Sequence, residues 1–443
     1  MQSPRFPSNH RPRCAAAVAL LLISAPPPAT ATAAEATASG RPQLQLVRHT
    51  IDTGIREADG QSLADIDGNG VNNPVVGTGS GGRVFWYERD PADPEPWRRH
   101  QIAGGFTEIE GTLAADFNGD GRIEVVIFDQ ATRNPPGLVA IARQDQDDPR
   151  GSWSTTLLDR EANHVQQGLV FDITGDGRLD FFYAYEGRGP GDGGFYWLQN
   201  LGGDPLDADN WVKHEIDQVS GAWWIDPHGP RDFNDNGNPG DIAVTVREGR
   251  NRQHSSGAVL IYHRPEDPVN DRWEKTVIAD LAGNDVLQIC SGDFTGNGDA
   301  RDLVVGVASH RGNAPVRHRG LHLYLHDGAA GAWTHVRLSS LHTAAVLGAD
   351  LTGDGRQEIV AMDRTHHRLQ LWRPDPSEQT GFRLEAEHPF RKADDLLLVD
   401  DINGDGHARD LYVGSDPDGM FWFELVEVDD PPAAAEGPAA DAP

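Results

Sequence analysis

A short acidic segment broken by glycine recurs seven times along this 443-residue chain. One copy reads DITGDGRLD, and successive copies start 51 to 61 residues apart. The copies begin at Asp65, Asp116, Asp172, Asp232, Asp293, Asp350 and Asp401, and each has glycine at its sixth position. Self-similarity at a period of this length indicates a repeat architecture, in which every copy belongs to the same supersecondary unit.

The residues around each copy indicate four short strands per unit. An apolar run precedes the acidic segment, a β-rich run such as DFFYAY or DLVVGV follows it, and two further runs are rich in aromatic residues. This composition favours strands, and long helical periodicity is absent from the sequence. A lone four-stranded sheet cannot bury both of its faces, whereas radially stacked sheets can. The sequence therefore predicts an all-β fold, a seven-bladed β-propeller of four-stranded blades.

The two ends of the repeat region complement each other. Leu44–Ile51 has the character of a fourth strand but follows no earlier unit, and the last unit, which ends at MFWFELVE, lacks one. We therefore expect the N-terminal strand to complete the seventh blade and close the ring, giving a propeller domain of residues 44–428. Residues 429–443 are rich in Ala, Pro and Asp, and we expect them to be disordered.

Residues 1–36 have the features of a signal peptide. Three arginines precede the apolar run CAAAVALLLISA, which is short for a membrane span, and no other stretch has the length to cross a membrane. We expect a secreted or periplasmic monomer after cleavage. Cys290 is then the only cysteine left, so no intramolecular disulfide can form. Its apolar neighbours suit a buried core residue better than a nucleophile.

The chain is strongly acidic, with 38 Lys and Arg against 68 Asp and Glu and a formal net charge of −30. Phosphate groups would be repelled, which argues against nucleic acid as a partner. Much of the acid lies in the seven loops rather than in one tail, which favours cation binding.

The copy that begins at Asp172 illustrates the chemistry of these loops. Side-chain oxygens stand at positions 1, 3, 5 and 9, and a mid-loop glycine folds the chain back. Hard oxygen ligands at alternate positions suit Ca²⁺. An EF-hand would need a glutamate at position 12 and flanking helices, but position 12 is Tyr183 within a β-rich run. The alternative is a set of tight Asx turns that need no metal.

The segment resembles the FG-GAP/VCBS repeat of integrin-α-type propellers, and its copies span nearly all of the expected mature chain. The resemblance implies several structural Ca²⁺ ions, each held between the first two strands of a blade. Three copies match the ligand pattern fully: Asp116, Asn118, Asp120 and Glu124; Asp172, Thr174, Asp176 and Asp180; and Asp350, Thr352, Asp354 and Glu358. Two carry one extra residue before the last acid: Asp293, Thr295, Asn297 and Asp302; and Asp401, Asn403, Asp405 and Asp410. Two offer fewer carboxylates: Asp65, Asp67, Asn69 and Asn73; and Asp232, Asn234, Asn236 and Asp241.

Chain topology places the acidic loops on one face of such a propeller and the links between blades on the other. The links surround the channel and differ from blade to blade, which favours one asymmetric ligand site. The candidates for catalysis there are His164, Asp226, His228 and His342. The candidates for ligand contacts are Glu108, Glu110, Gln167, Trp223, Trp224 and Gln288. Such side chains suit acid–base or metal-assisted chemistry and stacking on a sugar ring. The alternatives are solvated or strand-end histidines and tryptophans that pack between blades.

The loops that join second to third strands are basic in one sector despite the acidity of the chain. The candidates for binding an anionic group there, such as a carboxylate, sulfate or uronate, are Arg247, Arg311, Arg317 and His367. The alternative is a solvated surface balanced by neighbouring acids.

Three functions remain open from the sequence. The first is binding of an extracellular glycan or small anionic ligand. The second is a metal-assisted lyase, dehydratase or isomerase acting on a uronate or keto-sugar, with an additional divalent metal in the channel. The third is a protein-binding adhesion module. The sequence contains no GxSxG, HExxH or Walker motif, so it gives no signal for a serine hydrolase, a zincin or a P-loop enzyme.

Overall fold

A computed structural model describes most of the repeat region. It covers residues 43–55, 57–90, 96–130, 137–162, 164–189, 192–247, 257–281, 284–308, 318–328, 332–390, 397–415 and 419–428. The predicted signal peptide and the predicted disordered tail lie outside the described residues. Within them, no helix has the length and apolar character needed to cross a membrane.

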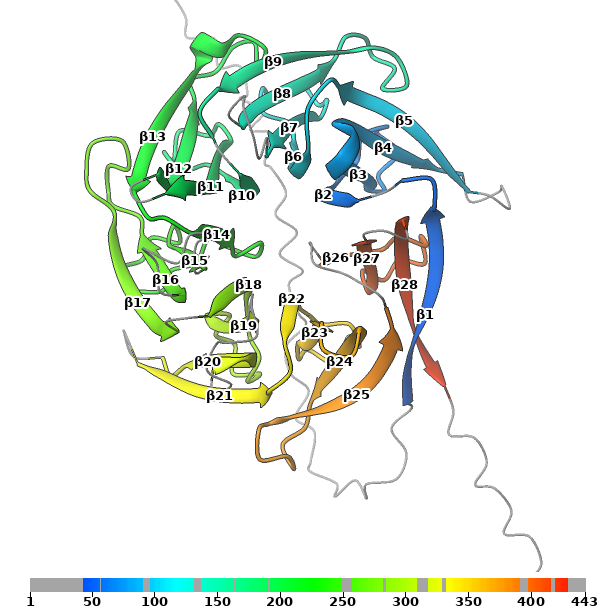
Figure 1. The fold of residues 1–443 in the computed structure, drawn as a ribbon, viewed down its shortest axis with the longest axis vertical. Helices are drawn as coiled ribbons and strands as arrows, with labels where there is room; N and C mark the ends of the chain where they lie inside the picture. Colours follow the sequence, from blue (N-terminus) through cyan, green and yellow to red (C-terminus); the bar gives the residue numbers. More distant parts are fainter. Residues whose placement is uncertain are drawn as a thin grey trace, which may run out of the picture. The chain divides into compact units, whose positions relative to one another are not determined.

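The described residues form seven antiparallel four-stranded sheets, which Figure 1 shows arranged around a common centre. Blades 1 and 2 are β2 (Ala58–Ala64), β3 (Asn73–Thr78), β4 (Arg83–Arg89), β5 (Trp97–Gly104), and β6 (Ile109–Ala115), β7 (Glu124–Asp129), β8 (Leu138–Gln144), β9 (Trp153–Asp159). Blades 3 and 4 are β10 (Val165–Phe171), β11 (Asp180–Gly189), β12 (Asp192–Asn200), β13 (Trp211–Asp217), and β14 (Ala222–Ile225), β15 (Ile242–Val246), β16 (Gly257–His263), β17 (Glu274–Leu281). Blades 5 and 6 are β18 (Asp285–Gly292), β19 (Asp302–Ala308), β20 (Gly320–His326), β21 (Trp333–Ser339), and β22 (Thr343–Ala349), β23 (Glu358–Asp363), β24 (Arg368–Pro374), β25 (Phe382–Pro389). Blade 7 is β26 (Leu397–Asp400), β27 (Asp410–Ser415), β28 (Gly419–Val428) and β1 (Gln43–Asp52).

The chain is therefore an all-β, seven-bladed propeller. The first strand of each sheet is innermost, and neighbouring inner strands contact each other, as β2 does with β6 and β18 with β22. In blade 7 the outermost strand is β1, which runs antiparallel to β28 from Gln43↔Val428 onward. β2 of blade 1 also contacts β27 of blade 7.

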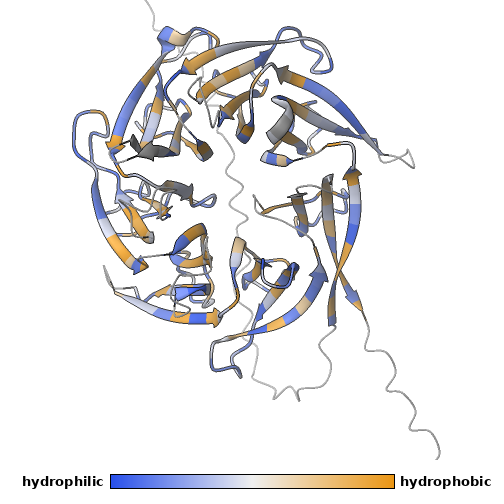
Figure 2. Cartoon of the chain, viewed as in Figure 1, coloured by the Kyte–Doolittle hydropathy of each residue, from blue (hydrophilic) through white to orange (hydrophobic). Residues whose placement is uncertain are grey.

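Burial follows the position of a strand within its blade. The residues of β7 and β18 are all buried, whereas those of the fourth strand β9 are partly buried or exposed except for Asp159 at its end. Figure 2 shows the same distribution, with hydrophilic residues along much of the outer strand β13. A second strand packed on both faces reads as a continuous apolar run, and this explains the β-rich run after each acidic loop.

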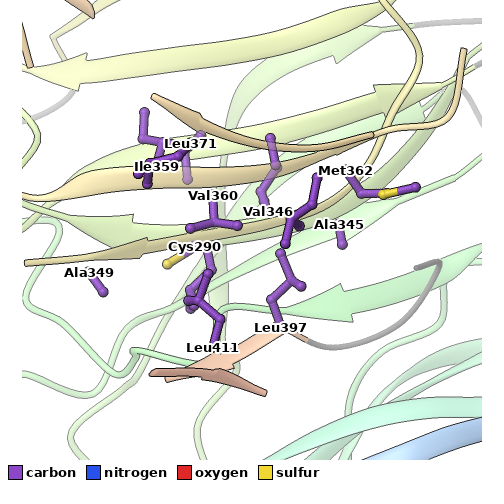
Figure 3. Packing of buried hydrophobic residues seen from close by; sticks show 14 of the residues in the cluster. Cys290, Ala345, Val346, Ala349, Ile359, Val360, Met362, Leu371, Leu397 and Leu411 are labelled. Atoms are coloured by element: carbon purple, nitrogen blue, oxygen red, sulfur yellow. The ribbon is translucent and has the colours of Figure 1, made fainter. Parts of the chain in front are cut away.

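Cys290 belongs to the largest apolar cluster, which joins blades 5, 6 and 7 to β1. Figure 3 shows it in the same group of side chains as Val360, Leu397 and Leu411. Burial raises the pKa of its thiol well above the ordinary value. The residue is a buried core member, as the sequence predicted.

Strands of adjacent blades approach each other very closely at two glycines. A Cβ atom placed on Gly60 of β2 would lie 2.7 Å from the backbone nitrogen of Gly111 in β6. A Cβ atom on Gly414 of β27 would lie 2.4 Å from the backbone carbonyl oxygen of Ala58 in β2. These two positions require glycine because no side chain fits between the neighbouring backbones.

Candidate functional site

The strand order sorts the connections onto two faces. Connections from first to second strands carry the acidic loops, and we call their side the loop face. Connections from second to third strands, and the links from one blade to the next, lie at the other end of the strands, which we call the link face. The two faces differ in how strongly they repeat.

The seven acidic loops have the same internal hydrogen bonds. In blade 3, the carboxylate of Asp172 accepts from the amides of Asp176 at 3.1 Å and Gly177 at 2.7 Å. The carboxylate of Asp180 accepts from the amide of Ile173 at 2.9 Å. The equivalent first aspartates, which accept from the same two positions, are Asp65, Asp116, Asp232, Asp293, Asp350 and Asp401. The first aspartate therefore folds its loop by accepting from the amides four and five residues further on, a longer reach than the two residues of an Asx turn.

The predicted calcium ligands at the fifth loop position are exposed, and each holds a turn of its own loop. In every copy a side-chain oxygen of this residue accepts from the amide two residues further on, as Asp354 does from Arg356 at 3.0 Å. The residues at this position are Asn69, Asp120, Asp176, Asn236, Asn297, Asp354 and Asp405. These oxygens thus bond to the backbone of the loop in the described structure, where the sequence predicted that they coordinate Ca²⁺.

The predicted ligands at the third loop position divide by residue type. The Asp and Asn members accept from the amide of the fifth residue, and they are Asp67, Asn118, Asn234 and Asn403. The hydroxyl of Thr174 donates to Asp172 at 3.4 Å, and that of Thr352 donates to Glu358 at 3.3 Å. Thr295 holds the same position in blade 5 and is exposed. Coordination of Ca²⁺ by the third and fifth residues stays a prediction, because the bonds in the described structure are those of Asx turns and local hydroxyl contacts.

The donor atoms of these loops suit a hard cation, but they are not drawn together around one point. Across the described ranges, no three or more His, Cys, Asp or Glu side chains gather as a metal site. Three of the fifth-position carboxylates pair with an arginine of their own loop, Asp120 with Arg122 at 2.7 Å, Asp176 with Arg178, and Asp405 with Arg409 at 3.4 Å.

The last residue of the loop pattern is a buried acid in every blade except blade 1. In most of these blades none of the described cationic side chains contacts it. Burial raises the pKa of Glu124 and of Glu358 to about 7, and the pKa of Asp180, Asp302 and Asp410 to about 6. In addition, Oε1 of Glu124 and Oδ1 of Asp410 are buried and have no hydrogen-bond partner among the described residues. A bound cation would supply the missing positive charge at these oxygens.

Blades 1 and 4 differ from the others at the last loop position. In blade 1 the residue is Asn73, a neutral amide whose oxygen accepts from the amide of Ile66 at 2.9 Å. In blade 4 the buried carboxylate of Asp241 lies 3.0 Å from Nδ1 of His263. These are the two loops that the sequence described as poorer in carboxylates.

On the link face the backbone repeats while the side chains do not. The carbonyl oxygen of the residue before an inner strand accepts a hydrogen bond from a backbone amide. That amide belongs to a residue near the end of the second strand of the same blade. We call the first of these residues the link position. The pairs are Glu57 with Gly79, Glu108 with Gln130, His164 with Glu186, Gly221 with Arg247, and His342 with Arg364. The same backbone turn thus presents acidic, neutral and imidazole side chains in different blades.

His164 is the centre of a buried polar network between blades 2, 3 and 4. Its Nε2 accepts from the amide nitrogen of Gln130, and its Nδ1 lies 3.3 Å from Oε2 of Glu186. Arg247 makes a bidentate pair with Glu186, at 2.9 Å from Nε and 2.7 Å from Nη2. The guanidinium carbon of Arg247 lies 3.4 Å from the ring centroid of Trp223. The charge of Arg247 is therefore neutralised by a buried carboxylate and covered by an indole.

This network changes the role expected for Arg247. The sequence placed Arg247 among the residues that bind an anionic ligand, but its donors already serve Glu186. Sequence reasoning missed Gln130 and Glu186. Gln130 directly follows the buried second strand β7, and Glu186 lies in the second strand β11. A polar residue at this point of an apolar run was the sequence feature that could have identified them.

Three other predicted ligand contacts lie inside the fold. Oε1 of Gln288 accepts from the amide of Val346 in the next blade at 3.0 Å, and Oε1 of Gln167 accepts over a longer 3.4 Å from Ile225. Trp224 is buried in the core between blades 4 and 5. These side chains stabilise contacts between blades, because inner-strand residues face the neighbouring blade. Trp223 is partly exposed.

Asp226 and His228 lie on the loop face, not on the link face. The sequence assigned them to a link, but β14 ends at Ile225, so both residues follow the inner strand. His164 and His342 precede their inner strands and lie at the opposite end. The structure therefore does not bring the four predicted catalytic residues together.

A cluster of basic side chains occupies the link face at blades 5 and 6, and we call Arg319, His342 and Arg364 the basic cluster. Nη1 of Arg319 donates to Nε2 of His342 at 2.6 Å. Burial, followed by the charges of Arg319 and Arg364, lowers the pKa of His342. Nε of Arg319 is buried and finds no acceptor in the described part of the chain.

The remaining candidates lie around this face. Glu108 and Glu110 are partly buried at the link into blade 2, and His367 is exposed in the turn between β23 and β24. Arg311 and Arg317 lie outside the described residues. The sequence reasoning grouped Arg319 and Arg364 with other basic loop residues but did not single them out.

Comparisons with known proteins assign no family to the chain. No family model matches it, and no curated protein does. Among solved structures, it is similar to a periplasmic gluconolactonase, PpgL, of Pseudomonas aeruginosa, with 16% identity over 75% of this chain and 85% of that chain and a TM-score of 0.48. It is also similar to the Dos1 propeller, with 8% identity over 83% of this chain and 82% of that chain and a TM-score of 0.47. The resemblance to FG-GAP/VCBS repeats stays a prediction.

Proposed function

We propose that this protein is a secreted or periplasmic propeller that binds a small anionic ligand, of the sugar-acid class, at the basic cluster on the link face. The observation that supports this most directly is the buried Nε of Arg319, a charged donor with no acceptor among the described residues. Buried donors are rarely left unpaired, since each costs about 1–3 kcal/mol or more. A ligand carboxylate would supply the acceptor.

The charges around His342 favour an anion over a neutral ligand. Because its pKa is lowered, His342 is uncharged at neutral pH and accepts from Arg319, which it thereby orients. The guanidinium groups of Arg319 and Arg364 and the carboxylate of Asp363 all act on His342, so two positive charges stand against one negative charge there, on a chain whose net charge is −30. The planar fork of a guanidinium matches the two oxygens of a carboxylate.

The acidic side of the link face suggests why the ligand would be a hydroxylated acid. Glu57 and Glu108 lie at the links into blades 1 and 2 and Glu110 lies near the start of β6, whereas the basic cluster lies at blades 5 and 6. Carboxylates accept hydrogen bonds from hydroxyl groups. A sugar acid offers both an anionic group and several hydroxyls, so it is complementary to such a divided surface.

We propose in addition that Ca²⁺ binds in the acidic loops and stabilises the blades. The residues that would hold it are the loop side chains named from the sequence, above all those of the loops that end in Glu124, Asp180 and Glu358. The support is the set of buried last acids with raised pKa values, which a cation would neutralise. Calcium there would supply positive charge and crosslink each first hairpin.

Isothermal titration calorimetry tests the ligand proposal. Galacturonate, glucuronate and gluconate are expected to bind, while the matched neutral sugars galactose and glucose are not. Arg319→Gln should weaken binding roughly ten- to a hundredfold, the value of one charge-assisted hydrogen bond. Arg122→Gln is the control, because Arg122 lies on the loop face and pairs with Asp120. The proposal fails if no sugar acid binds, or if both variants bind as the wild type does.

The same ligands distinguish binding from catalysis. After incubation, ultraviolet absorbance and chromatography show whether the ligand has been converted into a product. A product would mean that the protein is a lyase or an isomerase. A protein partner without any sugar-acid affinity would favour an adhesion module instead.

A further inference from the structure

The inner strand of blade 4 is interrupted where the other inner strands are continuous. Each of the other six ends at the residue immediately before the first aspartate of its acidic loop, as β18 does at Gly292. β14 ends at Ile225, seven positions before Asp232. The residues that leave the strand have the sequence DPHGP, and we call Asp226–Pro230 the blade 4 excursion.

Backbone bonds show where the excursion leaves the sheet. The amide of Asp226 donates to the carbonyl of Ala243 at 2.9 Å, and Arg231 pairs again with Asp241. Only Ile242 stands opposite the intervening residues. Pro227, His228, Gly229 and Pro230 are all partly exposed, in contrast to the fully buried residues of β18. The excursion therefore gives blade 4 an accessible polar segment at the loop-face end of its inner strand.

Asp226 brings a carboxylate oxygen without a donor to this segment. Its side chain is completely buried. Oδ1 accepts from the amides of Ser291 at 2.9 Å and of His228 at 3.0 Å, which fixes the carboxylate in place. Oδ2 is buried and has no hydrogen-bond partner within the described residues. A buried, unpaired carboxylate oxygen calls for a donor or a cation.

His228 brings a second acceptor. Its Nδ1 lies 3.0 Å from the carbonyl oxygen of Ser291, which can only accept, so Nδ1 carries the proton. In the neutral ring Nε2 then has a free lone pair, and no hydrogen bond to Nε2 occurs in the part of the chain that is described. Nδ1 also lies 3.1 Å from Sγ of Cys290, a buried thiol that stays protonated. Donation from one ring nitrogen to a backbone carbonyl is the arrangement that orients metal-ligating histidines.

We propose that the blade 4 excursion binds a divalent cation of the Zn²⁺ class through Oδ2 of Asp226 and Nε2 of His228. Two acceptors without donors, one of them charged, are complementary to a cation. Imidazole together with carboxylate favours Zn²⁺, Co²⁺ or Mn²⁺, whereas Ca²⁺ takes oxygen ligands. Because the described residues supply only these two ligands, water or a bound molecule would complete the coordination. This site lies on the loop face and is independent of the proposed sugar-acid site.

The test is titration of the chelator-stripped protein with Zn²⁺ in the presence of excess Ca²⁺, which occupies oxygen-only sites. The wild type should bind Zn²⁺ with one site that persists in Ca²⁺. His228→Gln and Asp226→Asn should each weaken this binding more than about tenfold. His407→Gln is the matched control, because His407 is an exposed histidine in the acidic loop of blade 7, on the same face. It should bind Zn²⁺ as the wild type does.

Two results would overturn the proposal. One is the absence of any Zn²⁺ binding by the wild type in excess Ca²⁺. The other is an unchanged affinity in His228→Gln, whose side chain is partly exposed and whose replacement the fold should tolerate. If Asp226→Asn lowers the melting temperature, His228→Gln decides alone. Substitution of Co²⁺ for Zn²⁺ adds a visible spectrum that should report nitrogen ligation in the wild type and lose it in His228→Gln.

Discussion

Acid should destabilise this propeller in part through one buried histidine of blade 5. His322 lies on β20 with 1% of its surface exposed. Its Nε2 is 3.0 Å from the carbonyl oxygen of His318, and its Nδ1 is 2.9 Å from Nε2 of His335. Burial, followed by the charge of His335, lowers the pKa of His322 to about 4, although the hydrogen bond to the His318 carbonyl acts in the opposite direction. A lowered histidine pKa means that the folded state resists protonation.

The direction of the effect follows from the two pKa values. The unfolded chain takes up a proton as the pH falls through 6.5, while the folded chain does so only near pH 4. Stability is therefore fully present above pH 6.5 and is lost as the pH falls toward about 4. At 1.36 kcal/mol for each pKa unit, the full loss is about 3 kcal/mol, of which roughly 2.5 kcal/mol is reached at about pH 4.5.

Urea denaturation at about pH 7.5 and about pH 4.5, in saturating Ca²⁺, measures this loss. His322→Gln keeps a donor toward the His318 carbonyl but does not titrate. Its unfolding free energy should fall by roughly 2.5 kcal/mol less than that of the wild type between the two pH values. His407→Gln serves as the control, because His407 is exposed, and should match the wild type.

Carboxylates that titrate in the same range are common to all three proteins and cancel in the comparison. The reasoning is refuted if wild type and His322→Gln lose equal stability on acidification. It is also refuted if His322→Gln is the more acid-sensitive of the two.

Three further outcomes follow from the fold and the loops. Leu46 of β1 is buried in the core, so Leu46→Asp should lower the unfolding free energy by about 3 kcal/mol or more, measured by urea denaturation; an unchanged midpoint would mean that β1 is not needed to complete blade 7. Gly60→Ala places a methyl group 2.7 Å from the Gly111 backbone and should cost about 1–3 kcal/mol, whereas Gly104→Ala, an exposed position whose methyl group would meet the flexible side chain of Gln101 at 3.2 Å, should change little in the same assay. Without Ca²⁺, Glu124 has a pKa raised to about 7, so its stabilising contribution is present below pH 4.5 and lost as the pH rises toward 7. EDTA should therefore lower the melting temperature most at neutral pH, and Ca²⁺ should restore it; no shift on chelation would contradict metal binding.

The sequence predicted the propeller because its repeat is visible in single residues. The sixth-position glycines, for example Gly121 and Gly177, have φ values of 85° and 86°, and this left-handed conformation explains why glycine recurs there. The strands around them follow from composition. The pairing of β1 with β28 matches what the unmatched end strands of the sequence indicated.

The site was harder to predict because its contacts join blades that are far apart in sequence. Arg247 and Glu186 are 61 residues apart, so the sequence showed a basic loop but not the buried acid that neutralises it. Asp226 and His228 were misplaced for another reason. The acidic loops of blades 3 and 4 start 60 residues apart, a spacing like that of other blades, so the interruption of β14 leaves no length signal.

The link turns are held by backbone hydrogen bonds that do not use the side chain of the link position. Each turn is held by the carbonyl of the link position, which every amino acid possesses, so residues as different as Glu108, His164 and Gly221 occupy equivalent places. Substitution there keeps the carbonyl acceptor, but Glu57, His164 and Gly221 have φ values of 55°, 64° and 88°, so these positions favour residues that tolerate a left-handed backbone. Within that limit recognition can change one blade at a time at the partly exposed link positions, whereas replacement of the buried His164 would also break its contacts with Gln130 and Glu186.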